Sequence, residues 1–255
     1  MTLAGRITLQ FHPDWPFRGR RVIEALADDG VYRSQFETGT SNGGLTAHPG
    51  GDRWRWESRI FAGRYDAARA EERPRYGALN RRGDPYGGSI RFGSAHLRLR
   101  PEVLERSTFC FPDSYLQPTA IGGPERLDEL CALADAAVSR GELDHLDDYV
   151  EAHVHGEVRP DRDAEAIVLD PCFRDGPVHE AAERLGCLVE WHPGLRVRTE
   201  GLDPDYRGPE FVALARSLGD ELVPSVVGDA ARTGDHDPQS LKRVWHLLAR
   251  YGRVG

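Results

Sequence analysis

Residues 148–156 read Asp-Tyr-Val-Glu-Ala-His-Val-His-Gly, and this stretch is the starting point for predicting the fold. Apolar and ionisable side chains alternate along it. Successive side chains of a β-strand point to opposite faces, so the alternation predicts a strand with Glu151, His153 and His155 on one face. A row of ionisable groups packs poorly in a core. The row therefore indicates a functional site.

The segments around this strand show the periodicities of both strands and helices. Further strands are expected at 7–11, 31–39, 90–99, 107–111, 164–169 and 187–191. Helices are expected at 20–28, 53–61, 127–138, 178–185, 210–218 and 240–251. Strands scattered among helices, with few regular β-α-β units, predict an α+β fold. We expect one domain over residues 1–255, with a catalytic core from Arg33 to Leu169 and a helical C-terminal extension, 174–255, packed on it.

Composition limits the function classes. The 255 residues are 39% hydrophobic and 29% charged, as in soluble globular proteins. The net charge of −8 argues against a broad nucleic-acid footprint. No apolar run approaches the roughly 20 residues that span a bilayer, so no membrane partner is expected. The four cysteines form no Cys-x-x-Cys pair. These features predict a cytoplasmic protein, or one exported as an effector by a route that the sequence does not show.

The motifs of three common classes of enzyme are absent from the sequence. There is no Gly-x-Ser-x-Gly elbow for a serine nucleophile, and neither a P-loop nor a Gly-x-Gly-x-x-Gly turn between strand and helix.

Lys242 is the only lysine among 33 basic residues. A GC-rich genome produces the same bias, so no function is inferred from it.

A metal site is one interpretation of the row at 151–155. Glu151, His153 and His155 are suitable ligand types, and a His-x-His pair is a plausible chelate. A further ligand would have to come from elsewhere, and the candidates His145, His179, His192 and Asp148 have no diagnostic spacing. A metal-dependent hydrolase therefore stays open as an alternative. A non-catalytic binding protein is another, with the glycine-rich segment 40–52 and the tryptophans Trp54 and Trp56 as its surface.

A third arrangement joins three of the predicted strands. Arg33, the pair Ser107-Thr108 and Glu151 resemble the Arg–Ser–Glu triad of the ADP-ribosyltransferases. The bend after Glu151 and the apolar run at 164–169 are also similar to the segment that follows the catalytic glutamate in that superfamily. The resemblance is incomplete, because Phe109 replaces a polar residue in the middle motif. The chain as a whole, over 32–44, 54–80, 92–114 and 149–173, resembles a bacterial family of domains of unknown function.

The resemblance to ADP-ribosyltransferases implies a fold and a reaction. The fold would be two packed, mainly antiparallel sheets with flanking helices. The substrate would be NAD, and the acceptor a protein, a nucleic acid or a small molecule. Cleavage of the nicotinamide–ribose bond develops oxocarbenium character, which the Glu151 carboxylate would stabilise. The residues expected to contact NAD are Arg33, Gln35, Ser107, Thr108, Tyr76 and Asn80. Arg33, Ser107 and Glu151 should then converge in one cleft.

Overall fold

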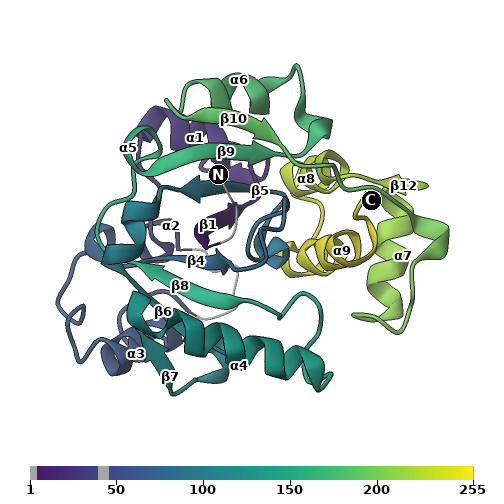
Figure 1. Ribbon diagram of the computed structural model, residues 1–255. Coiled ribbons are helices and arrows are strands. Elements are labelled where there is room, and N and C mark those ends of the chain that lie inside the picture. The colour runs from purple at the N-terminus through teal and green to yellow at the C-terminus, as the bar shows by residue number, and fades with distance from the viewer. Residues whose placement is uncertain (1–4, 40–45, 255) are drawn as a thin grey trace.

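A single eight-stranded sheet forms the centre of the computed structural model, which describes residues 5–39 and 46–254 (Figure 1). The strand order is β10-β9-β5-β1-β4-β8-β6-β7, and among these described strands only the β9–β10 pair is parallel. The strands are β1 (Arg6–Phe11), β4 (Arg75–Asn80), β5 (Ala95–Leu99), β6 (Ser107–Phe111), β7 (Ala120–Gly122), β8 (Val150–Val154), β9 (Ala164–Leu169) and β10 (Leu188–Trp191). Two short ribbons pair β2 (Pro16–Phe17) with β3 (Arg20–Arg21), and β11 (Val197–Arg198) with β12 (Glu221–Leu222).

The expectation of two packed sheets was wrong, because hydrogen bonds run without a break from β10 to β7.

The α-helices are α1 (Val22–Asp29), α2 (Gln35–Thr38), α3 (Asp52–Ile60), α4 (Leu127–Ser139), α5 (Pro160–Asp163), α6 (Pro177–Glu183), α7 (Pro209–Leu218), α8 (Pro224–Thr233) and α9 (Pro238–Tyr251). Short 3-10 helices are η1 (Ala70–Glu72), η2 (Ile90–Phe92), η3 (Pro101–Arg106), η4 (Ser114–Leu116), η5 (Pro124–Arg126), η6 (Pro171–Phe173) and η7 (Thr199–Gly201).

The two faces of the sheet differ in polarity. One face is apolar and packs against α1, α4 and α6 in a single hydrophobic cluster. Its strand residues include Ile7, Leu9, Leu79, Leu97, Phe109, Val150, Ala152, Val154 and Leu169. The opposite face is polar and nevertheless buried, with Thr8, Gln10, His96, Arg98, Glu151 and His153. The alternation in the sequence therefore predicted correctly that the ionisable residues of β8 share one face.

A second hydrophobic cluster is built by α7, α8 and α9, which lie together at the right of Figure 1. Trp245 of α9 is fully buried in it, and its indole Nε1 donates to the carbonyl oxygens of Ile90 (3.2 Å) and Arg91 (3.0 Å). These contacts attach the C-terminal helices to η2. The expected extension 174–255 is not purely helical, because β10 lies within it and extends the central sheet.

The strand expected at 31–39 was wrong. Residues 35–38 form α2 instead, and Ser34 and Glu37 make a capping box at its start. The Ser34 hydroxyl accepts from the Glu37 amide (3.2 Å), while the Ser34 amide donates to the Glu37 carboxylate (2.7 Å). These bonds satisfy the amides at the start of the helix, which an isolated strand here would leave unpaired. Arg33 therefore precedes a helix.

The predicted strands at 7–11, 107–111, 164–169 and 187–191 are confirmed, as are the helices at 53–61, 127–138, 178–185, 210–218 and 240–251. The segment 90–99 is only partly extended, since it begins with η2 and becomes a strand at Ala95. Helix α8 was not predicted. Within the described ranges, no helix has the length and apolar character needed to cross a membrane.

Replacing Trp245 with alanine tests the second cluster. We expect a loss of about 3–5 kcal/mol in the free energy of unfolding, because a cavity replaces a fully buried indole. Urea denaturation measures it. Leu188→Ala is the control, since Leu188 is 66% exposed and its loss should change stability by under about 0.5 kcal/mol. Equal effects of the two substitutions would contradict this assignment of the core.

Candidate functional site

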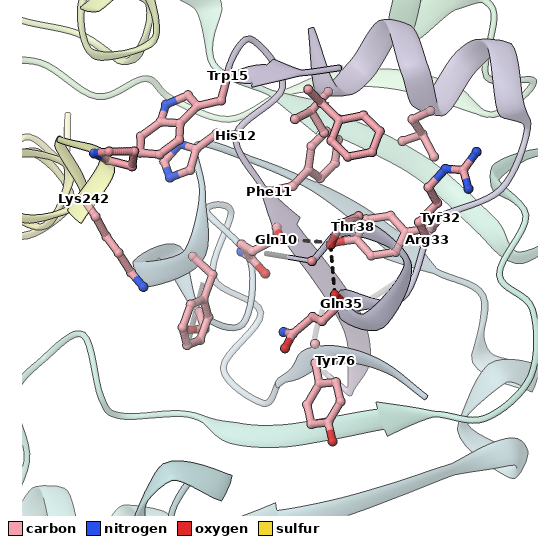
Figure 2. A pocket seen from close by; sticks show the side chains of 18 of the residues that line it. Gln10, Phe11, His12, Trp15, Tyr32, Arg33, Gln35, Thr38, Tyr76 and Lys242 are labelled. Carbon is pink, nitrogen blue, oxygen red and sulfur yellow. Dashed lines mark hydrogen bonds between the residues drawn. The ribbon is translucent and has the colours of Figure 1, made fainter. Parts of the chain in front are cut away.

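A cleft of about 530 Å³ opens where β1 and β4 separate. The two strands pair with each other as far as Thr8 and Ala78. Beyond Thr8, β1 is paired with β5 in the described structure, and before Ala78, β4 is paired with β8. Gly77 lies at this point, and a Cβ there would come within 2.5 Å of the Thr8 carbonyl oxygen. Residues from β1, β4, β8, α1 and α9 line the cleft, and Figure 2 shows side chains around it.

Glu151 of β8 lines the cleft and is only 6% exposed. Its Oε2 accepts hydrogen bonds from the Ser114 hydroxyl (3.0 Å) and the Ser114 amide (3.3 Å). Its Oε1 lies 2.9 Å from Nε2 of His153. The Ser114 hydroxyl in turn accepts from the Arg53 guanidinium at 2.7 Å. Three side chains from different segments thus hold one carboxylate.

This environment keeps the Glu151 carboxylate ionised. Burial is the largest influence on its pKa and raises it. The hydrogen bond and charge of His153, the charge of Arg53 and the Ser114 hydroxyl together outweigh burial, so the pKa lies below its ordinary value. A buried charge without such partners would be strongly unfavourable. The site therefore presents a negative charge, fixed in position, to the cleft.

A hydrogen-bonded chain continues behind Glu151. The Thr108 hydroxyl lies 3.1 Å from Nδ1 of His153 and 3.2 Å from Nε2 of His155. The Tyr65 hydroxyl lies 2.7 Å from Nδ1 of His155. Burial, followed by nearby positive charges that include His153, lowers the pKa of His155 to about 4, so His155 is neutral at pH 7. The chain fixes the ring of His153 against Glu151.

Tyr76 is fixed beside this carboxylate. The guanidinium of Arg53 lies over its ring at 3.9 Å from the centroid, and the Tyr76 hydroxyl donates to Oε1 of Glu57 at 3.0 Å. Arg73 donates to the other Glu57 oxygen at 2.6 Å. The hydroxyl is thus engaged away from the cleft, and the ring lines it (Figure 2).

The structure brings four of the predicted site residues to one cleft: Arg33, Gln35, Tyr76 and Glu151. Arg33 is partly exposed, and its guanidinium pairs with Asp29 (2.9 Å) and Glu37 (3.3 Å). It reaches the cleft from the segment before α2, not from the strand that the sequence suggested.

The other predicted residues lie elsewhere. Ser107 is paired with Val154 on the apolar side of the sheet, and its hydroxyl donates to the Val103 carbonyl oxygen (2.7 Å), so it does not converge with Glu151. Thr108 lies behind the carboxylate, as described above. Asn80 lines a separate pocket of about 320 Å³ and hydrogen-bonds the backbone of Asp84.

The possible metal ligands that the described structure brings together differ from the set considered from the sequence. Among the described residues, Cys110, Glu151 and His153 place possible ligand atoms within 4.8 Å of one another. His155 is not in this group, and Tyr65 and Thr108 engage its two nitrogens. The pKa of the Cys110 thiol is raised well above its ordinary value, by burial first and then by the charge of Glu151. A protonated thiol is a poor ligand.

Asp148 and His192 do not join this group. Asp148 pairs with Arg81 and Arg82, and the ring of His192 lies 3.0 Å from the Ser94 carbonyl oxygen. His145 lines the second pocket, and His179 packs edge-on against Trp191. The tryptophans expected as a binding surface face inward in part, since Trp56 is 4% exposed. Positions 40–45 of the glycine-rich segment lie outside the described residues.

Several residues of the site were not found from the sequence: Arg53, Ser114, Trp15, Ser89 and Lys242. Arg53 and Ser114 are 61 positions apart, so no local pattern links them. The Nε1 atom of Trp15, the Oε1 atom of Gln35 and the hydroxyl of Ser89 are buried without a partner among the described residues. The sequence distinguishes Lys242 in one way, because it is the only lysine in the chain.

Comparison with known proteins gives a family. No curated protein matches this chain. A family model matches residues 6–141 and 127–251, which cover most of its length. This confirms the resemblance to a family of domains of unknown function. The chain belongs to the family described as "Protein of unknown function (DUF3626)".

Proposed function

We propose that the protein is an NAD-dependent ADP-ribosyltransferase and that Glu151 is its catalytic carboxylate. The observation that carries the proposal is a buried, ionised carboxylate, held by Ser114, His153 and Arg53, at the wall of a cleft of about 530 Å³. Pockets of this size typically hold ligands of drug-like or cofactor size. The acceptor is a protein, a nucleic acid or a small molecule.

The chemistry needs a fixed negative charge. When nicotinamide departs with the electron pair of the C–N bond, positive charge develops on the ribose. A carboxylate already held in place stabilises that charge without reorganising. The acceptor then forms a bond to the ribose carbon and loses a proton. The same site would hydrolyse NAD if water took the place of the acceptor.

The walls of the cleft suit a dinucleotide. The ring of Tyr76 lies beside Glu151 and could contact nicotinamide, and Trp15 and Phe92 provide further aromatic surface. Buried polar atoms without partners are unfavourable, so those of Trp15, Gln35 and Ser89 favour a polar ligand. Arg33 could contact phosphate, as the sequence suggested, only by loosening its pairs with Asp29 and Glu37.

The two alternatives have less support. A metal-dependent hydrolase using Glu151, His153 and His155 conflicts with the engagement of both His155 nitrogens, and the Arg53 charge would oppose a cation near Glu151. A non-catalytic binding protein gives no reason for keeping the Glu151 charge buried. We therefore retain ADP-ribosyl transfer as the proposal.

Substituting Glu151 with glutamine tests the reaction. We expect nicotinamide release from NAD to fall by about 10²–10³-fold, the usual loss when one electrostatic stabiliser of a transition state is removed. Release is measured by chromatography with cell lysate as a source of acceptors. The exposed Glu157→Gln is the matched control and should act like the wild type. Unchanged release by Glu151→Gln, with the melting temperature preserved, would refute the assignment. Loss of release on chelation would favour the hydrolase.

The pH dependence follows from the lowered pKa of Glu151. A carboxylate whose pKa is lower in the folded state stabilises the fold above its unfolded pKa, and this stabilisation is lost as the pH falls through the folded pKa. Glu151 should also stay ionised, and therefore active, at every pH above its folded pKa. Nicotinamide release should therefore stay constant as the pH falls toward the ordinary glutamate pKa.

Ser114→Ala removes a hydrogen bond to the charged form of Glu151 and should raise its pKa. We expect the acidic limb of the pH–rate profile to move to higher pH in this variant. Ser139→Ala removes an exposed hydroxyl on α4 and should leave the limb in place. If both variants keep the wild-type profile, ionisation of Glu151 does not control the rate.

A further inference from the structure

We propose that Lys242 binds phosphate, which makes the α9 end of the cleft an anion subsite. The proposal rests on the proposed function in one respect, because the expected occupant is the diphosphate of the dinucleotide. It assigns a residue that the resemblance to ADP-ribosyltransferases did not include.

The position of Lys242 is the first argument. Its side chain starts from α9 on the His12 side of the cleft and extends into the cleft, with its ammonium directed away from Trp15 (Figure 2). No ion pair of Lys242 is found within residues 5–39 and 46–254, although most arginines in these ranges have a carboxylate partner. A partly buried ammonium without a counter-ion is available to an anionic ligand.

The surrounding charges are the second argument. Burial is the main cause that lowers the pKa of Lys242, to about 8, and the remaining causes are the positive charges of Arg91 and Arg243. Arg91 is itself paired with Asp147. His12 is neutral, because burial and then the Lys242 charge lower its pKa to about 3. Among the described residues, no acidic group contributes to the pKa shift of Lys242, so an anion here would offset a positive charge that these residues leave unopposed.

Hydrogen-bond donors are the third argument. The indole Nε1 of Trp15 and the hydroxyl of Ser89 are buried, line the same cleft and have no partner among the described residues. Both can donate to phosphate oxygens. A lysine on a flexible stem serves as a point charge for phosphate, and the Ser89 hydroxyl would supply a directed donor.

The first turn of α9 adds to this environment. Pro238, Gln239 and Lys242 all line the cleft, so the positive end of the helix dipole lies at the same wall. Asp237 caps the helix through the Ser240 amide at 2.8 Å and offsets part of that charge. The ammonium of Lys242 therefore carries most of the expected attraction.

Calorimetric titration with ADP-ribose and with adenosine tests the subsite. Lys242→Gln should weaken ADP-ribose binding by about 10- to 100-fold, the usual effect of losing a charged hydrogen bond, and should leave adenosine binding unchanged. Lys242→Arg keeps the charge and should recover part of the affinity. Arg243→Gln removes the exposed neighbouring charge and should resemble the wild type.

The single lysine allows a second measurement on the unaltered protein. Acetylation of Lys242, followed by mass spectrometry of its peptide, should accelerate as the pH rises through about 8. Saturating ADP-ribose or inorganic pyrophosphate should slow it, because a bound anion holds the proton on the amine and blocks access. Acetylation that neither ligand slows would overturn the proposal.

Other outcomes also separate the two proposals. Equal weakening of ADP-ribose and adenosine by Lys242→Gln, or equal losses in Lys242→Gln and Arg243→Gln, would show that Lys242 has no specific role toward phosphate. If the wild type releases no nicotinamide but binds ADP-ribose through Lys242, transfer chemistry fails and the anion subsite stands. If Glu151→Gln loses turnover while Lys242→Gln binds ADP-ribose normally, the subsite alone fails.

Discussion

The buried charge of Glu151 constrains the polar side of the sheet around β4, β6 and β8. A carboxylate removed from water without partners is unfavourable by several kcal/mol, so its neighbours must hold it. Those neighbours come from three places: His153 from the same strand, Ser114 from the turn after β6, and Arg53 from α3. Ser114 links Arg53 to Glu151, because its hydroxyl accepts from Arg53 and donates to Glu151.

Strand register keeps these groups together. Ala78 and Cys110 are the partners of Glu151 on the two neighbouring strands, and Tyr76 and Thr108 are the partners of His153. A slip of one residue would turn these side chains to the opposite face and expose the apolar set that packs against α1, α4 and α6. The hydrophobic core therefore fixes the geometry of the polar site, although the two lie on opposite faces.

The sequence predicted what depends on local periodicity. The alternation in 148–156 placed Glu151 on the polar face, and apolar spacing located the long helices near 127–138 and 240–251. It failed where another local signal competed, since the alternation in 31–39 suggested a strand while Ser34 and Glu37 form a helix cap. It also failed for partners distant in the chain, because nothing near Glu151 indicates that Ser114 holds it.

Two opposite charges at the walls of the cleft bear on the kind of ligand that we propose. Glu151 contributes a negative charge from β8, and Lys242 contributes a positive charge from α9. The proposed ligand has the opposite arrangement, with a cationic nicotinamide ring and an anionic diphosphate. Electrostatic complementarity of this kind favours one orientation of the ligand over the reverse, because reversal would place like charges together. A single lysine in an arginine-rich chain thus gains a proposed role once the fold places it in the same cleft as the buried carboxylate.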